Sequence, residues 1–170
     1  SFIDQASLYG IFNNTQLFAI NLADYTTMSA VKNLPKGLHS ATRYVAAWPN
    51  TQDNRDYDNS YTNLYGDHPT NWSWEAAVGI DYLISALKET GGTDNKKLAE
   101  AMKGKTRKSF MGVGDGNTVS IRDKDQTIID YSIGWGTTIA NDPYMTNIQA
   151  ADWNTIEELE KKWLADKDWL

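Results

Sequence analysis

Cysteine is absent from the 170-residue sequence. Its absence excludes a disulfide framework, a thiolate metal site and a cysteine nucleophile. Histidine is scarce as well: the chain has two, His39 and His68, and neither lies in a metal or hydrolase motif such as HExxH or GxSxG. We therefore expect no metal site, no cofactor and no enzymatic activity.

Basic residues are too few for a nucleic-acid-binding face. The chain has 22 Asp and Glu against 16 Lys and Arg, a formal net charge of −6, whereas phosphate binding needs a basic surface. The one short basic cluster, Lys103 to Lys108, is expected to be a solvated loop. Apolar runs are also short, and none reaches the ~18 residues of a membrane span.

The start of the sequence lacks an initiator methionine and a signal-peptide pattern. We therefore expect a piece of a longer protein, with any signal peptide outside this chain.

Helical and strand-like periodicities alternate along the chain, which predicts an α/β protein. A hydrophobic content of 41% and a charged content of 22% are typical of a globular domain with a real core. Predicted helices cover residues 2–11, 28–34, 53–65, 73–90, 96–104 and 154–167. Predicted strands cover residues 17–20, 37–48, 109–114, 118–123 and 127–138.

The predicted helix over residues 73–90 is apolar on almost every side. One apolar face is widened by Ala77, Val78 and Tyr82, which favours a helix buried on most sides. Trp74 lies one step inside this helix, beside Val78, and is expected to cover the core. The residues of the first face are Ala76, Ile80, Leu83, Ile84 and Leu87.

Four segments follow one another in a specific order. The first, LFAINLADY through AVKNLPKGLHSATRYVA, is a predicted strand, helix and strand. The buried helix HPTNWSWEAAVGIDYLISALKETGG, the short helix LAEAMKG and the strand-turn-strand segment FMGVGDGNTVSIRDKDQTIIDYSIG come next. This order resembles the carboxy-terminal part of type I periplasmic binding proteins, and in particular the Leu/Ile/Val-binding receptors of ABC importers.

The resemblance implies a portion of a two-lobed fold, with Rossmann-like parallel sheets flanked by helices. Residues 1–48 would form a strand and helix segment of the second lobe, and residues 49–108 a helical segment of the first lobe. Residues 109–170 would supply crossover strands and a C-terminal helix. Together these segments would make up about the last half of a receptor.

The implied function is capture of a small organic ligand, such as an amino acid, an amide or an aromatic acid. Capture would take place in the periplasm or outside the cell, between lobes that close like a hinge. The complete receptor would deliver the ligand to an ABC permease in the membrane. Without the missing N-terminal half, the apolar helix over residues 73–90 would be exposed, and we expect self-association.

Ligands of open α/β sheets bind at the carboxyl ends of strands, and two candidate places follow predicted strands here. Asn21, Asp24 and Tyr25 follow the strand over residues 17–20. The resemblance implies that the Asp24 carboxylate pairs with the ammonium group of a ligand. An equal alternative is that Asp24 caps the N-terminus of a helix. Tyr44 and Trp48 are expected on one face of the strand over residues 37–48, and packing between lobes is the alternative for Trp48.

The third candidate place is the stretch just before the N-terminus of the predicted helix over residues 73–90. By position, Thr70, Asn71 and Trp72 match the stretch that contacts the ligand from the first lobe in the resembling receptors. Trp72 would stack on an apolar or planar ligand, and Asn71 would supply a donor and an acceptor.

Two other functions remain open from the residues alone. Seven Trp, nine Tyr and 22 acidic residues suit sugar stacking and paired carboxylates, so a carbohydrate-active enzyme or carbohydrate-binding module is one alternative. A ligand-sensing regulator built on the same receptor fold is the other.

Overall fold

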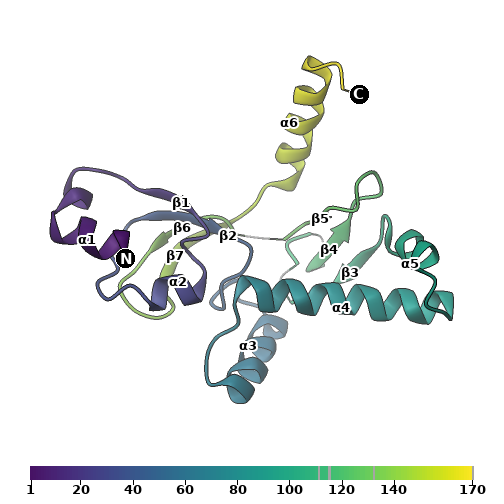
Figure 1. The fold of residues 1–170 in the computed structure, drawn as a ribbon, viewed down its shortest axis with the longest axis horizontal. Coiled ribbons are helices and arrows are strands. Elements are labelled where there is room, and N and C mark those ends of the chain that lie inside the picture. Colours follow the sequence, from purple (N-terminus) through teal and green to yellow (C-terminus); the bar gives the residue numbers. More distant parts are fainter. Residues whose placement is uncertain (111, 115, 132, 170) are drawn as a thin grey trace.

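The computed structural model describes residues 1–110, 112–114, 116–131 and 133–169. The described chain forms two units, each with its own sheet, and a helix that projects from them (Figure 1). The helices are α1 Phe2–Leu8, the short 3₁₀ helix η1 Ile11–Asn13, α2 Tyr25–Ser29, α3 Gln52–Tyr65, α4 Asn71–Thr90, α5 Asn95–Met102 and α6 Trp153–Asp166. The strands are β1 Phe18–Ile20, β2 His39–Thr42, β3 Thr106–Lys108, β4 Thr118–Ile121, β5 Ile128–Ile129, β6 Ile133–Thr138 and β7 Met145–Ala150.

The first unit is a four-stranded sheet in the order β1-β2-β6-β7, with α1 and α2 packed beside it. The pair β1 and β2 is parallel, and α2 lies in the connection between them, as in a βαβ unit. The pairs β2 and β6, and β6 and β7, are antiparallel. The parallel pairing that the resemblance implies is therefore confirmed for one pair of strands. The chain returns from the second unit to add β6 and β7, which complete a mixed sheet.

The second unit contains α3, α4, α5 and the antiparallel three-stranded sheet β3-β4-β5. The chain enters this unit after β2 and leaves it after β5. Its long helix, α4, begins after Thr70, whose hydroxyl accepts from the Ser73 backbone, and ends at Gly91, which adopts a left-handed conformation with φ of 65°.

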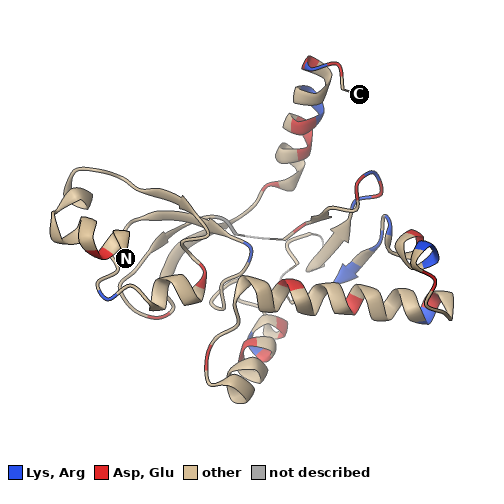
Figure 2. Cartoon of the chain, in the orientation of Figure 1, with Lys and Arg blue, Asp and Glu red and all other residues tan. Residues whose placement is uncertain are grey.

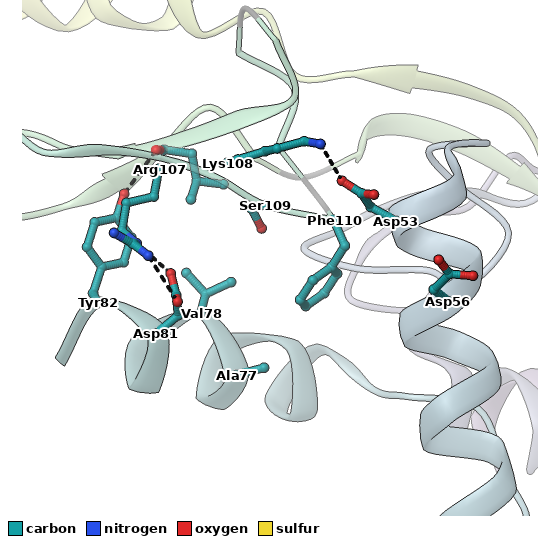
Figure 3. A pocket seen from close by; sticks show the side chains of 11 residues that line it. Asp53, Asp56, Ala77, Val78, Asp81, Tyr82, Arg107, Lys108, Ser109 and Phe110 are labelled. Carbon is teal, nitrogen blue, oxygen red and sulfur yellow. Dashed lines mark hydrogen bonds and ion pairs between the residues drawn. The ribbon is translucent and has the colours of Figure 1, made fainter. Parts of the chain in front are cut away.

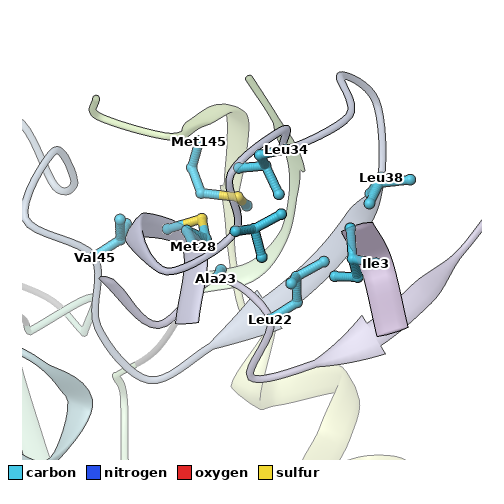
Figure 4. Packing of buried hydrophobic residues seen from close by; sticks show 9 residues of the cluster. Ile3, Leu22, Ala23, Met28, Leu34, Leu38, Val45 and Met145 are labelled. Carbon is cyan, nitrogen blue, oxygen red and sulfur yellow. The ribbon is translucent and has the colours of Figure 1, made fainter. Parts of the chain in front are cut away.

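Each unit has a separate hydrophobic core. The first core lies between the first sheet, α1 and α2 (Figure 4), and Met28 at its centre is fully buried. The second core forms where α4 packs on β4, with Trp74 at 1% exposure. Trp48 contacts both cores. The first core consists of Ile3, Leu22, Ala23, Met28, Val31, Leu34, Leu38, Val45 and Met145, and the second of Tyr44, Trp74, Val78, Tyr82, Val119 and Ile121.

The buried face of α4 is not the face that the sequence predicts. Val78, Tyr82 and Ala86 are buried in line with Trp74, as the expectation for Trp74 requires, whereas Ile80 is 54% exposed. The expectation that α4 is buried on most sides is therefore wrong, because the rest of the described chain packs against one line of its residues only. The exposed apolar face comprises Ala76, Ile80, Leu83 and Ile84, with Leu87 half-buried.

Two predicted strands also differ from the structure. The strand expected over residues 37–48 ends at Thr42, because Val45 to Trp48 form a turn closed by a hydrogen bond from the Trp48 N–H to the Val45 carbonyl. The continuous apolar run over residues 17–20 is typical of a strand covered on both faces, but β1 is exposed on one face, where Ile20 is 83% and Phe18 59% exposed.

The C-terminal half contains three further corrections. The basic cluster expected as a loop contains β3, because Thr106 to Lys108 pair with β4. Strand β7 was missed, since its residues MTNIQA show little alternation and become a strand by pairing with β6. Helix α6 begins at Trp153 with Asp152 as its N-cap, one residue before the predicted start at residue 154. The predicted strands over 109–114 and 127–138 include positions 111 and 132, which lie outside the described residues.

Charges of both signs are interspersed over the second unit and α6 (Figure 2). Arg122 and Lys124, on the β4–β5 hairpin, form ion pairs with Glu160 of α6. Among the described helices, none combines the length and apolarity needed to cross a bilayer. Within the same residues, His, Asp and Glu form no group of three suited to a metal ion.

Candidate functional site

Asn71, the first residue of α4, joins the two units by hydrogen bonds. Its side-chain Oδ1 accepts from the Thr42 hydroxyl at 2.6 Å, from the Arg43 N–H at 3.1 Å and from the Tyr44 N–H at 2.8 Å. The residue is 3% exposed. One side-chain oxygen therefore accepts hydrogen bonds from three successive residues, at the point where β2 ends and the crossover to the second unit begins.

Asp24 completes this junction from the first unit. Its Oδ1 accepts from the Thr26 N–H at 3.1 Å and so caps α2, and its Oδ2 accepts from the Asn71 N–H at 3.0 Å. The N-termini of α2 and α4 therefore meet at one buried carboxylate, where both helix dipoles favour its negative charge. The N-cap alternative for Asp24 is confirmed, and both of its oxygens are occupied by protein donors.

Thr70 and Trp72 lie on either side of Asn71 and have different roles. The Thr70 side chain caps α4 in a reciprocal arrangement with Ser73. Trp72 is 69% exposed, and the Arg43 guanidinium lies 5.8 Å from its ring centroid. Arg43 also forms an ion pair with Glu75 at 2.9 Å. A planar surface with an adjacent cation is thus open to solvent at the mouth of α4.

A hollow of about 300 Å³ lies beside the junction, lined by α2, the Val45–Trp48 turn, α3 and the turn between β6 and β7. Tyr25 and His68 face each other in it, with ring centroids 5.1 Å apart in an edge-on arrangement. His68 Nδ1 lies 2.7 Å from Asp58 Oδ1, and its Nε2 lies 3.6 Å from Asp142 Oδ1. Three segments far apart in the sequence therefore meet at one imidazole ring.

Neighbouring carboxylates raise the pKa of both Tyr25 and His68. A hydrogen bond with Asp67, together with partial burial, raises the pKa of Tyr25 to about 12. Burial lowers the pKa of His68, but the hydrogen bond and charge of Asp58 and the charges of Asp142 and Asp67 outweigh it, so the pKa is raised above 6.5.

The remaining sequence-predicted site residues lie elsewhere. Tyr44 is 1% exposed in the second core, where burial raises the pKa of its hydroxyl, and Trp48 is half-buried between the cores. The two do not share a strand face, because β2 ends before both. Asn21 is exposed in a left-handed turn with φ of 63°. Five of the predicted site residues lie at the N-termini of α2 and α4: Asp24, Tyr25, Thr70, Asn71 and Trp72.

Sequence reasoning missed His68, Asp58 and Asp142 as neighbours of Tyr25. His68 stands directly before Pro69 at the mouth of α4, which is a local signal for a residue at a helix entrance. The other two residues belong to α3 and to the β6–β7 turn, and no local pattern connects them with His68.

The fold places the chain in a class of α/β proteins built from two units joined by crossover segments. More particularly, the chain belongs to the periplasmic binding proteins, because the family model described as periplasmic binding protein matches residues 1–134. No curated protein matches the sequence.

Solved structures of ABC-transporter binding proteins are similar to this chain. One is a solute-binding protein from Rhodopseudomonas palustris BisB5 in complex with 3,4-dihydroxybenzoic acid, with a TM-score of 0.71 and 22% identity over 85% of this chain and 39% of that one. An amino acid ABC transporter substrate-binding protein from Pseudomonas fluorescens Pf-5 has a TM-score of 0.71 and 19% identity, over 88% of this chain and 41% of that one.

A third similar structure is an R. palustris solute-binding protein in complex with benzoate. Its TM-score is 0.65 and its identity 15%, over 88% of this chain and 39% of that one. The chain thus spans about two fifths of the length of these proteins. Its fold is a portion of the type I periplasmic binding protein fold.

Replacement of Asn71 by Ala is expected to destabilise the protein by roughly 2–4 kcal/mol, because buried donors of the crossover would lose their acceptor. The measurement is urea unfolding followed by circular dichroism. Asn63→Ala, an exposed change on α3, is the matched control and should lie within about 0.5 kcal/mol of the parent. Equal stabilities of the two variants would contradict the role given to Asn71.

The raised pKa of His68 predicts a pH-dependent contribution to stability. A folded-state pKa above the unfolded value of 6.5 means that the contribution is fully present below pH 6.5 and is lost as pH rises through the folded-state value. The melting temperature of His68→Asn should therefore fall below that of the parent at acidic pH and approach it at alkaline pH. Asp58→Asn should show the same trend, and parallel pH profiles for parent and variants would refute the assignment.

Proposed function

We propose that this chain is part of a solute-binding protein that captures a small organic ligand for an ABC importer. The observation that carries the proposal is the family match over residues 1–134, joined to the similar structures of ABC-transporter binding proteins. The whole protein would work in the periplasm and deliver its ligand to a membrane permease. In the proposed division, residues 1–48 belong to the second lobe and 49–108 to the first, with crossover strands and the C-terminal helix over 109–170.

The proposed site is the junction between the units, at the mouths of α2 and α4. Asp24 and Asn71 use their oxygens to join the two units, so they hold the site in shape. The groups proposed to contact a ligand are Trp72 and Arg43, with Tyr25 in the hollow beside the junction. Thr70 caps α4 at the same junction, whereas Tyr44 and Trp48 support it from the cores.

These available groups favour an aromatic acid as the ligand. A planar ring would stack on Trp72, and its carboxylate would pair with Arg43. The Arg43–Glu75 pair is partly exposed, with 39% and 32% of the side chains accessible, so exchanging Glu75 for a ligand carboxylate costs little. An α-amino acid is less favoured, because both oxygens of Asp24 already accept from protein donors.

Neither alternative function has comparable support. The similar structures are transport receptors and not carbohydrate-active enzymes. A sensing regulator would use the same binding site, and no residue on the chain favours sensing over transport.

Benzoate is expected to stabilise the chain, by about 2.7 kcal/mol at a concentration of 100 times Kd, whereas leucine and glucose leave the melting temperature unchanged. Differential scanning fluorimetry measures the shift. Trp72→Ala should abolish it, and Trp169→Ala, which removes a Trp of similar exposure at 66%, should preserve it. A shift that survives in Trp72→Ala would place the ligand elsewhere.

The chain alone is also expected to self-associate through the exposed face of α4. Ile80, Leu83 and Ile84 are exposed and lie three or four residues apart on α4, so their side chains form one contiguous apolar surface. Light scattering should therefore give a mass above 19.1 kDa that falls to the monomer value in Ile84→Lys. Leu64→Lys, on α3 at 76% exposure, is the control and should leave the assembly intact; a monomeric parent would contradict the expectation.

A further inference from the structure

A second pocket lies between α3, α4 and β3, away from the junction of the two units (Figure 3). Its volume of about 430 Å³ falls within the range of roughly 300–1,000 Å³ typical of small-molecule sites. It shares no lining residue with the hollow that contains Tyr25 and His68. We call it the α3–α4 pocket.

The base of the α3–α4 pocket is apolar and firmly held. Val78, Tyr82 and Val119 belong to the second core, and the Tyr82 hydroxyl is already bound to the Val119 carbonyl at 2.9 Å. Phe110 reaches into the space between α3 and α4, and its ring stacks on Tyr57 with centroids 3.9 Å apart. The pocket is therefore preformed for the apolar body of a ligand, which reduces the entropic cost of binding.

The rim of the pocket is charged, and both of its cationic side chains form ion pairs with carboxylates. Arg107 holds Asp81 through two nitrogens, at 2.5 and 3.1 Å, and Lys108 lies 3.1 Å from Asp53 (Figure 3). An anionic ligand would have to break one of these pairs.

Asp56 is the third carboxylate of the rim, and its charge is unmatched. It accepts from the neutral Gln52 amide at 2.7 Å, and no ion pair joins it to a cation within the described part of the chain. Three carboxylates against two cations leave the α3–α4 pocket with one excess negative charge, located on α3 above an apolar base.

We propose that the α3–α4 pocket binds a primary organic ammonium with an apolar body. The ammonium pairs with Asp56, and the body packs on Ala77, Val78 and Phe110. This ligand class is opposite in charge to the aromatic acid proposed for the junction, so the two sites select different molecules. The inference does not depend on the junction site.

The test uses three probes of similar shape and different charge: benzylamine, benzyl alcohol and benzoate. Each is titrated into the chain while the amide resonances are followed by two-dimensional NMR. Benzylamine should shift the resonances of Ala77, Val78 and Phe110 and bind at least about tenfold tighter there than the other two probes, because charge-assisted hydrogen bonds are roughly twice as strong as neutral ones. Equal binding of benzoate at these residues, or no binding of benzylamine, overturns the proposal.

Two variants locate the amine. Asp56→Asn, an exposed change that retains the shape of the side chain, should weaken benzylamine binding about tenfold or more, while Glu158→Gln on α6 makes the same charge change without effect. Ala77→Phe fills the pocket and should abolish the shifts. Unchanged affinity in either pocket variant, with the native spectrum retained, refutes the site. Trp72→Ala should leave benzylamine binding intact, which separates this result from a failure of the junction site.

Discussion

The buried carboxylate of Asp24 is the point on which the arrangement of the two units depends. It caps α2 of the first unit and accepts the first N–H of α4 in the second unit. Asn71 then uses its side-chain oxygen to fix the end of β2 and the start of the crossover. Because these groups are buried, separating them would leave several donors and one charge without partners, at a high cost in free energy.

This junction also positions the two pairs of candidate ligand groups. Fixing the mouths of α2 and α4 against each other brings Tyr25 into contact with His68 and exposes Trp72 beside Arg43. The buried polar side chains of Asp24 and Asn71 hold the two units together. The groups proposed for ligand binding, Trp72 and Arg43, are aromatic and cationic and lie at the surface.

Much of the fold and part of the candidate site could be predicted from local signals. The helices α3, α4 and α5, the N-cap of Asp24 and the burial of Trp74 follow from capping residues, glycines and periodicity. Strand β7 and the end of β2 could not be predicted, because pairing partners far along the chain decide where a strand forms. His68 and its carboxylates were missed for the same reason, since α3 and the β6–β7 turn meet only in three dimensions.

The sequence by itself determined the α/β class, the presence of the long helices and the family resemblance, since these depend on short-range periodicity and on the order of elements. Only the tertiary structure decided which side of α4 is buried and which polar groups remain free. The helix is apolar nearly all round, so its pattern does not select a face, and the packing of Trp74, Val78 and Tyr82 on β4 makes the choice. Likewise, Asp24 and Asn71 are polar residues in the sequence, and it is their burial against each other that makes them the connection between the two units.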